Sequence, residues 1–130
     1  MLRFLEVAHV LYLHKEVIDD FGGMHGVRDE NLLDSAVNVP RVAFGGEYLH
    51  KTIPAMAAAY AFHLCQNHPF FDGNKRIALS SSVAFLEING YELPVAKGIM
   101  SEKVLSVASG KMNKDELTSF YEEFAVPTRK

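Results

Sequence analysis

Residues 68–76 contain more chemically active side chains than any other part of this 130-residue chain, and they read His-Pro-Phe-Phe-Asp-Gly-Asn-Lys-Arg. An imidazole such as that of His68 can accept a proton near neutral pH. Asp72 offers hard oxygen ligands of the kind that Mg²⁺ prefers. Lys75 and Arg76 add cations suited to phosphate. A base, a metal ligand and a phosphate-binding group together indicate phosphoryl or nucleotidyl transfer.

Apolar residues at helical spacing lie on both sides of this stretch, which is therefore predicted to be a loop between two helices. Pro69 has no N–H and clashes in a helix interior, so the first helix should end near Asn67 or His68. The residues at helical spacing before the loop are Ile53, Met56, Ala57, Tyr60, Ala61 and Leu64, and those after it are Ile77, Ser81, Ala84, Phe85 and Ile88.

The second helix should start at Asp72 or Gly73, because short polar residues and glycine suit the cap position. The free backbone N–H groups of Gly73, Asn74 and Lys75 then carry the positive end of the helix dipole, which binds anions such as phosphate. Phe70 is expected to anchor the loop in the core.

A purely structural interpretation is open for each residue taken singly. The loop can be a tight connection between helices, Lys75 and Arg76 a solvated first turn, and His68 a helix-end residue that pairs with carbonyls. The combination of all these side chains in one short motif favours a functional site.

The stretch resembles the signature of the Fic/Doc family, His-x-Phe-x-Asp-Gly/Ala-Asn-x-Arg, and more narrowly that of the Doc, or death-on-curing, toxins. Fic proteins carry Gly where this chain has Lys75, and usually a second Arg where it has Leu79. Ile77 stands where Thr is often found. Further blocks match in the same order, so that the resemblance covers about residues 9–125: Phe21-Gly22-Gly23, Gly26-Val27-Arg28-Asp29, Leu32-Leu33-Asp34-Ser35-Ala36 and Phe44-Gly45-Gly46-Glu47.

The predicted helices, about six around one central helix, make an all-α fold, and the length and composition indicate a single compact domain over residues 1–130. Residues 41–51 lack a helical period and are predicted to form a small β-hairpin or an irregular flap. In Fic-related proteins the equivalent flap lies beside the motif and holds an extended target segment through main-chain hydrogen bonds. Tyr48 and His50 are the flap side chains expected to contact a target; an ordinary surface loop is the alternative.

The activity implied by the resemblance is that of a protein Ser/Thr kinase. Asp72 would hold Mg²⁺ and His68 would activate a serine or threonine hydroxyl of a protein target. A lysine at position 75 obstructs the pose in which Fic proteins transfer AMP, which favours transfer of the γ-phosphoryl of ATP. AMP transfer and a non-enzymatic module that binds nucleotide or peptide remain alternatives. The residues expected to bind the nucleotide are Gly73, Asn74, Lys75 and Arg76.

Family likeness also implies two protein partners. The target would be a threonine of elongation factor Tu, with translation arrest as the consequence. The other partner would be an antitoxin whose disordered tail folds onto the toxin. The chain lacks the Ser/Thr-x-x-x-Glu-Gly/Asn inhibitory motif of many Fic chains, which favours restraint by another chain.

Composition and charge narrow the function classes. A net charge of −3 and a pI near 6.0 give no broad basic surface, so no direct nucleic-acid partner is expected. No run approaches the ~18 apolar residues of a membrane span. Residues 2–13 are interrupted by Glu6 and His9 and are followed by no cleavage site, and the single Cys65 suits a reducing compartment. We therefore expect a cytoplasmic protein that does not bind membranes.

The other elements follow from periodicity and caps. Helices are predicted over residues 4–20, 29–39 and 95–109, and after a capping box of Asn113 and Glu116. Thr52 is predicted to cap the helix that leads to the motif. His9 and His14 are five residues apart, which puts them on different faces of the first helix, at the surface or core edge. Residues 126–130 are predicted to be a frayed tail. The predicted core face of the first helix consists of Phe4, Val7, Ala8, Leu11 and Ile18.

Overall fold

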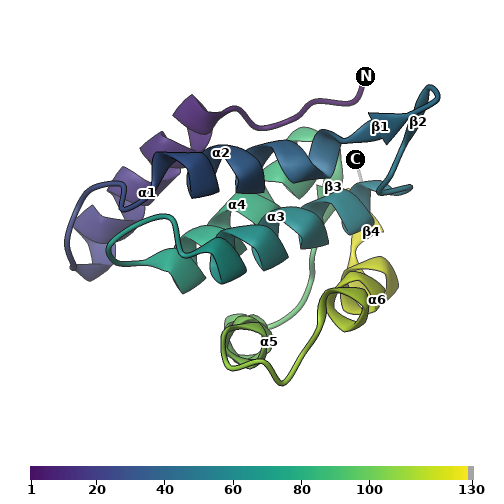
Figure 1. Ribbon diagram of the computed structural model, residues 1–130. Helices are drawn as coiled ribbons and strands as arrows, with labels where there is room; N and C mark the ends of the chain where they lie inside the picture. The colour runs from purple at the N-terminus through teal and green to yellow at the C-terminus, as the bar shows by residue number, and fades with distance from the viewer. Residues whose placement is uncertain (129–130) are drawn as a thin grey trace.

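The computed structural model describes residues 1–128, and its helices account for nearly the whole architecture (Figure 1). The predicted all-α class is confirmed. The helices in this range are α1 (Val7–Phe21), α2 (Glu30–Asn38), α3 (Ile53–Asn67), α4 (Asn74–Ile88), α5 (Lys97–Ala108) and α6 (Lys114–Phe124), with a short 3₁₀ turn, η1 (Val39–Arg41), after α2.

No helix within residues 1–128 has the length and apolar character that crossing a membrane requires.

Helix α3 is the centre of the fold. It packs against α2, α4, α5 and α6, and it is buried on nearly all sides. A helix that is apolar all round must lie inside a protein rather than on its surface. The small side chains of its Ala-rich first half allow the neighbouring helices to approach closely; the buried residues are Pro54, Ala55, Met56, Ala57, Ala58, Ala59, Tyr60, Ala61, Leu64 and Cys65.

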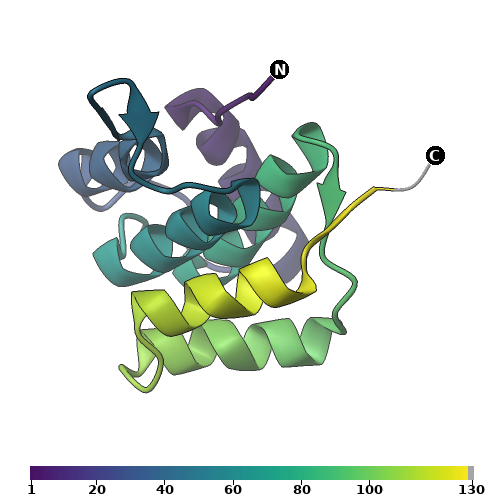
Figure 2. The ribbon, with the colours of Figure 1, turned by 90° about the vertical axis from the view of Figure 1, so that its right-hand side faces the viewer.

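Helices α5 and α6 form a separate layer on one side of the α3–α4 pair. They are seen nearly end-on in Figure 1 and side-on in Figure 2, so they run across α3 and α4. A buried hydrogen bond of 2.6 Å between the hydroxyls of Ser82 and Tyr121 joins α4 to α6. Tyr121 is fully buried, so this bond satisfies a polar atom that would otherwise be costly in the core.

Two predicted caps define helix starts in the structure. The Thr52 hydroxyl accepts the N–H of Ala55 at 3.0 Å and begins α3. Asn113 and Glu116 exchange side-chain-to-backbone hydrogen bonds of 2.8 and 2.9 Å at the start of α6, which is the predicted capping box. These ends could be predicted because a cap is a local interaction, made within one turn.

Two predicted helix starts were placed too early. Helix α1 begins at Val7 instead of residue 4, because Glu6 and His9 form a capping box at that point. Helix α5 begins at Lys97 instead of residue 95, because the backbone of Ala96 is extended, with φ −57° and ψ 141°.

Residues 41–51 contain the predicted hairpin. Strands β1 (Ala43–Phe44) and β2 (Glu47–Tyr48) pair in antiparallel fashion. Gly45 and Gly46 make the turn with φ values of 57° and 83°, which lie in the left-handed region that glycine enters without strain.

The end of the chain differs from its prediction. Strand β4 (Val126–Pro127) pairs with β3 (Tyr91–Glu92), and the N–H of Thr128 donates to the carbonyl of Gly90 at 2.8 Å. The frayed tail is therefore wrong for residues 126–128, which a distant partner strand holds in place. Residues 129–130 lie outside the described range.

Acidification should destabilise the fold through His63. Its Nε2 and the Nδ1 of His50 are buried without a hydrogen-bond partner within residues 1–128. Burial, with Lys114 and His50 nearby, lowers the pKa of His63 to about 4. The unfolded chain, with its ordinary pKa of 6.5, takes up the proton first, so stability present above pH 6.5 is lost as the pH falls towards 4.

We expect the free energy of unfolding to fall by about 1 kcal/mol over that interval on account of His63, since solvent screening reduces the full linkage value. Urea titrations at a series of pH values measure it. His63→Gln should flatten the dependence, and a variant with the slope of the wild type would contradict this origin.

Candidate active site

The loop between α3 and α4 begins with an unusual backbone conformation. Helix α3 ends at Asn67, and His68 caps it with φ 51° and ψ 53°. Within residues 1–128, His68 is the only residue other than glycine with a positive φ. This left-handed conformation costs a residue with a Cβ about 1 kcal/mol and turns the chain sharply before Pro69. The imidazole of His68 lies at the surface.

Phe70 anchors the loop, as predicted, with 1% of its surface exposed. Its ring stacks on His14 of α1, with centroids 3.7 Å apart and planes 8° from parallel. The same imidazole donates from Nε2 to the backbone carbonyl of Asp72 at 2.8 Å. Burial lowers the pKa of His14, so this ring stays neutral and serves as a fixed support for the loop.

The buried side chain of Asn74 holds the two ends of the loop together through hydrogen bonds to Phe70. Its side chain is 4% exposed, accepts the N–H of Phe70 at 3.0 Å and donates to the Phe70 carbonyl at 2.9 Å. Sequence reasoning assigned Asn74 to the nucleotide. In the structure both hydrogen bonds of the Asn74 side chain are made to the backbone of Phe70. The group of Asn74 that can face a phosphate is therefore its backbone N–H.

The first turn of α4 has no side-chain cap. Gly73 is the N-cap residue, with φ 78°, and the helix begins at Asn74, within a residue of the predicted start. The uncapped N–H groups and the helix dipole make this turn a favourable place for an anion. Gly73 is needed for space as well, because a Cβ there would lie 3.1 Å from Cδ1 of Ile18.

Three charged side chains are exposed around this turn: Asp72, Lys75 and Arg76. The Oδ2 of Asp72 accepts the N–H of Met24 at 2.7 Å, which orients the carboxylate. The guanidinium of Arg76 lies over the ring of Phe21, 3.9 Å from its centroid. A stacked guanidinium keeps its N–H edges free for a ligand. The site therefore has an exposed imidazole, an oriented carboxylate, two cations and a helix N-terminus.

The sequence profile of the Fic/DOC family matches residues 4–86, which include this loop and the helices on both sides of it. The chain belongs to the Fic/DOC family. Two relatives show the similarity of this chain to Doc proteins. Toxin Doc of Mycolicibacterium smegmatis (strain ATCC 700084 / mc(2)155) is 42% identical over 73 residues, 56% of this chain and 56% of the relative. Protein kinase doc of Escherichia phage P1 is 26% identical over 92 residues, 71% of this chain and 72% of the relative.

The matched segment thus spans only a little over half the length of Toxin Doc. The family of the chain is established by the profile match, which includes the motif loop and the helices on both sides of it.

The donor set around Asp72 fits Mg²⁺ held jointly with a substrate. Within residues 1–128 no group of three His, Cys, Asp or Glu side chains could hold a metal ion. Mg²⁺ commonly binds through one or two carboxylates, with substrate phosphates and water completing its shell. Asp72 supplies one exposed carboxylate with one oxygen already oriented by Met24. Phosphate oxygens of a bound nucleotide would have to supply the remaining ligands of such a site.

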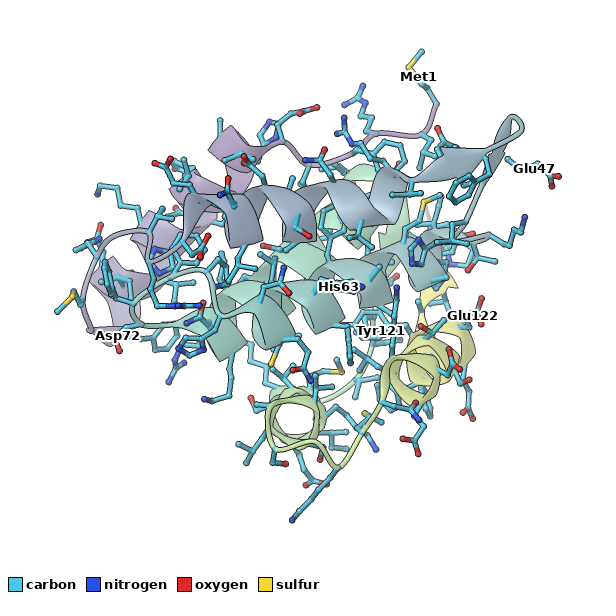
Figure 3. The ribbon with its side chains drawn as sticks, in the orientation of Figure 1. Met1, Glu47, His63, Asp72, Tyr121 and Glu122 are labelled. Atoms are coloured by element: carbon cyan, nitrogen blue, oxygen red, sulfur yellow. The ribbon has the colours of Figure 1, made fainter. Side chains whose placement is uncertain are left out.

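The predicted position of the flap is wrong. The hairpin precedes α3 and the motif follows it, so the whole helix of 15 residues, about 22 Å long, separates them. In Figure 3, Glu47 of the hairpin and Asp72 of the motif lie at opposite ends of the molecule. Tyr48 packs edge-on against Phe4, 5.5 Å between centroids, and His50 is 8% exposed. Neither residue lies beside the motif.

Sequence reasoning missed three residues that hold the site of this Fic/DOC protein: His14, Phe21 and Arg28. Arg28 donates to the carbonyls of His68 and Asn67 across a sequence separation that no periodicity reveals. A signal for His14 did exist. It belongs to the buried stripe Val10, His14, Val17 and Ile18, which has helical spacing, whereas Ala8 and Leu11 of the predicted core face are exposed.

Replacing Asn74 with alanine should destabilise the fold. The change leaves the buried N–H and carbonyl of Phe70 without partners, which costs about 2 to 3 kcal/mol in total. Asn38→Ala is a matched control, because that exposed amide donates a single bond, to the Asp34 carbonyl at 2.8 Å, and its loss should cost less than about 0.5 kcal/mol. Urea unfolding measures both; equal losses would contradict the role of Asn74 in the loop.

Proposed function

We propose that this protein is a Doc-type toxin, an enzyme that transfers the γ-phosphoryl group of ATP to a serine or threonine hydroxyl of a protein target. The observation that carries the proposal is the exposed His68 on one loop with the uncapped N-terminus of α4, Asp72, Lys75 and Arg76. The name Protein kinase doc of one relative supports phosphoryl transfer, and the name Toxin Doc of the other supports a toxin.

In the proposed reaction His68 takes the proton from the target hydroxyl. The hydroxyl oxygen then bonds to the γ-phosphorus, the bond from that phosphorus to the β,γ-bridging oxygen breaks, and ADP leaves with the electron pair. The backbone N–H groups of the first turn of α4, with Lys75 and Arg76, neutralise charge on the phosphates. Mg²⁺ held by Asp72 would offset charge on the phosphate oxygens.

Phe21 supports phosphate binding by orienting Arg76. Its ring holds the Arg76 guanidinium in a plane, so less side-chain freedom is lost when phosphate binds. His14 also supports the site, because it fixes the backbone of Asp72 through a hydrogen bond and Phe70 through ring stacking.

Lys75 supports γ-phosphoryl transfer over AMP transfer. A glycine at this position leaves room for an α-phosphate at the first turn of the helix, whereas a lysine fills that room and adds charge. The nucleotide would then bind in the reverse direction, with its γ-phosphate towards His68. AMP transfer to a protein hydroxyl is the alternative.

The proposed partners follow from family likeness. Elongation factor Tu is the proposed target, and an antitoxin with a disordered tail is the proposed inhibitor. An apolar groove of about 790 Å³ supports the second proposal, because it runs along α4 between α1 and α5 and has Lys75 and Arg76 in its lining. A segment folded into this groove would reach the proposed phosphate site.

Parallel incubations with ATP labelled at the γ or the α phosphorus test the reaction. The purified protein is mixed with elongation factor Tu, and the target is also analysed by mass spectrometry. Transfer of the γ label and a phosphate-sized mass increase are expected. Transfer of the α label with an AMP-sized increase would establish the alternative. Nucleotide binding without any product from this or other cellular targets would favour a non-catalytic module.

A further inference from the structure

The C-terminus of α3 lacks the backbone bonds that usually close a helix. Its last carbonyls would normally accept N–H groups from the residues that follow. Pro69 has no N–H to give. The N–H of Phe70 is already donated to Asn74 Oδ1 at 3.0 Å. The carbonyls of Asn67 and His68 therefore need a donor from elsewhere in the chain.

Arg28, in the loop between α1 and α2, supplies that donor. Its Nε donates to the His68 carbonyl at 2.7 Å and its Nη2 donates to the Asn67 carbonyl at 3.1 Å. One guanidinium thus binds the two consecutive carbonyls on either side of the left-handed turn. Its positive charge also lies at the negative end of the α3 dipole, where a cation is favourable.

The backbone around Arg28 extends the same contact. The N–H groups of Arg28 and Asp29 donate to the Pro69 carbonyl at 2.7 and 3.1 Å, and Val27 pairs with Phe70 in an isolated antiparallel bridge. Backbone bonds therefore fix Pro69 and Phe70 even when the Arg28 side chain is removed. Only the turn at His68 depends on hydrogen bonds from the Arg28 side chain itself.

We propose that Arg28 is a positioning residue that holds His68 in its left-handed conformation, and so fixes where the imidazole lies relative to the first turn of α4. This inference rests on the proposed function for its catalytic consequence. A residue with φ of 51° returns readily to more favourable backbone angles unless its surroundings prevent it. The two bonds from Arg28 prevent it, because each carbonyl changes direction when the angles of His68 change.

The geometry requires an arginine. The guanidinium is a planar group whose adjacent N–H bonds point in fixed directions and can reach two carbonyls together, whereas a lysine ammonium is a point charge on a flexible stem. A lysine at position 28 would keep the favourable charge at the helix end but would bind one carbonyl at a time. The Arg28→Lys variant should therefore recover part of the kcat that the Arg28→Ala variant loses.

Kinetics of the Arg28→Ala and Arg28→Lys variants test the inference. In Arg28→Ala the kcat for γ-phosphoryl transfer should fall about 10- to 100-fold, as expected when a reacting group is misplaced. The KM for ATP should stay within about twofold, because the phosphate-binding turn is held by other contacts. Arg28→Lys should lie between alanine and the wild type. Arg41→Ala is the matched control, since Arg41 also donates to a carbonyl, that of Leu5 at 3.3 Å, and should leave both constants unchanged.

A second measurement does not depend on activity. Backbone ¹⁵N relaxation gives the order parameter of the His68 amide, which should be near 0.85 in the wild type and fall below about 0.6 in Arg28→Ala. An unchanged order parameter would overturn the inference. So would an unchanged kcat, and so would a loss expressed only in the KM for ATP, which would make Arg28 a nucleotide ligand. If the wild type transfers no phosphoryl group, the proposed function fails, and the order parameter alone decides whether Arg28 positions His68.

Discussion

Replacing His68 with asparagine is expected to lower kcat for γ-phosphoryl transfer by about 100- to 10,000-fold, which is the usual contribution of a general base. Asparagine removes the imidazole but tolerates the left-handed backbone better than most residues do, so the turn before Pro69 should persist. The phosphate-binding groups lie on α4 and do not involve the imidazole. Binding of ATP, measured by calorimetry, should therefore change by less than about threefold.

His25→Asn is the control for this experiment. His25, in the loop that follows α1, is also an exposed histidine, and its Nε2 pairs with Asp19 of α1 at 3.1 Å. Transfer by that variant should match the wild type. A His68→Asn protein that binds ATP normally and still transfers the label at the rate of the wild type would show that another group accepts the proton.

The ends of α3 and α4 could be predicted from the sequence because local chemistry determines them. Pro69 excludes a helix interior, Thr52 supplies a cap, and a glycine at position 73 permits a left-handed cap. The hairpin in residues 41–51 could be predicted for the same reason, since two adjacent glycines define its turn. Each of these signals acts within one or two turns of the chain.

The arrangement of the site could not be predicted in the same way, because distant contacts determine it. Arg28 and His68 are joined over a separation of 40 residues, and His14 and Asp72 over 58. Pairing of β3 with β4 joins two strands that are too short to show a period-two pattern. The predicted position of the flap rests on family likeness, which places a flap beside the motif, whereas in this chain the length of α3 separates the two.

The apolar face of α1 shows how a polar residue can mislead a periodicity argument. Val10, His14, Val17 and Ile18 form the buried stripe, but a histidine counted as polar interrupts that apolar pattern, so periodicity favours the neighbouring face. The burial of His14 is favourable only because Phe70 and the Asp72 carbonyl meet its ring and its N–H. Its place in the core is therefore a consequence of the motif loop, which the helix alone cannot reveal.

Replacing Lys75 with glycine is expected to change the product from a phosphorylated to an adenylylated target. Lys75 is exposed in the first turn of α4, so truncation removes bulk and charge from the proposed phosphate site without opening the core. Space for an α-phosphate at the helix N-terminus should then let the nucleotide bind in the direction that leads to AMP transfer. Parallel reactions with α- and γ-labelled ATP, and the mass of the target, measure the change.

Lys75→Met separates the two properties that glycine removes together. Methionine keeps most of the length of the side chain but not its charge, so the steric argument predicts slower transfer that is still confined to the γ label. If methionine and glycine both yield the α label, charge rather than bulk selects the direction of the nucleotide. If the glycine variant gives only phosphorylated target, the first turn of α4 does not discriminate between the two poses, and the choice of γ-phosphoryl transfer must come from elsewhere in the site.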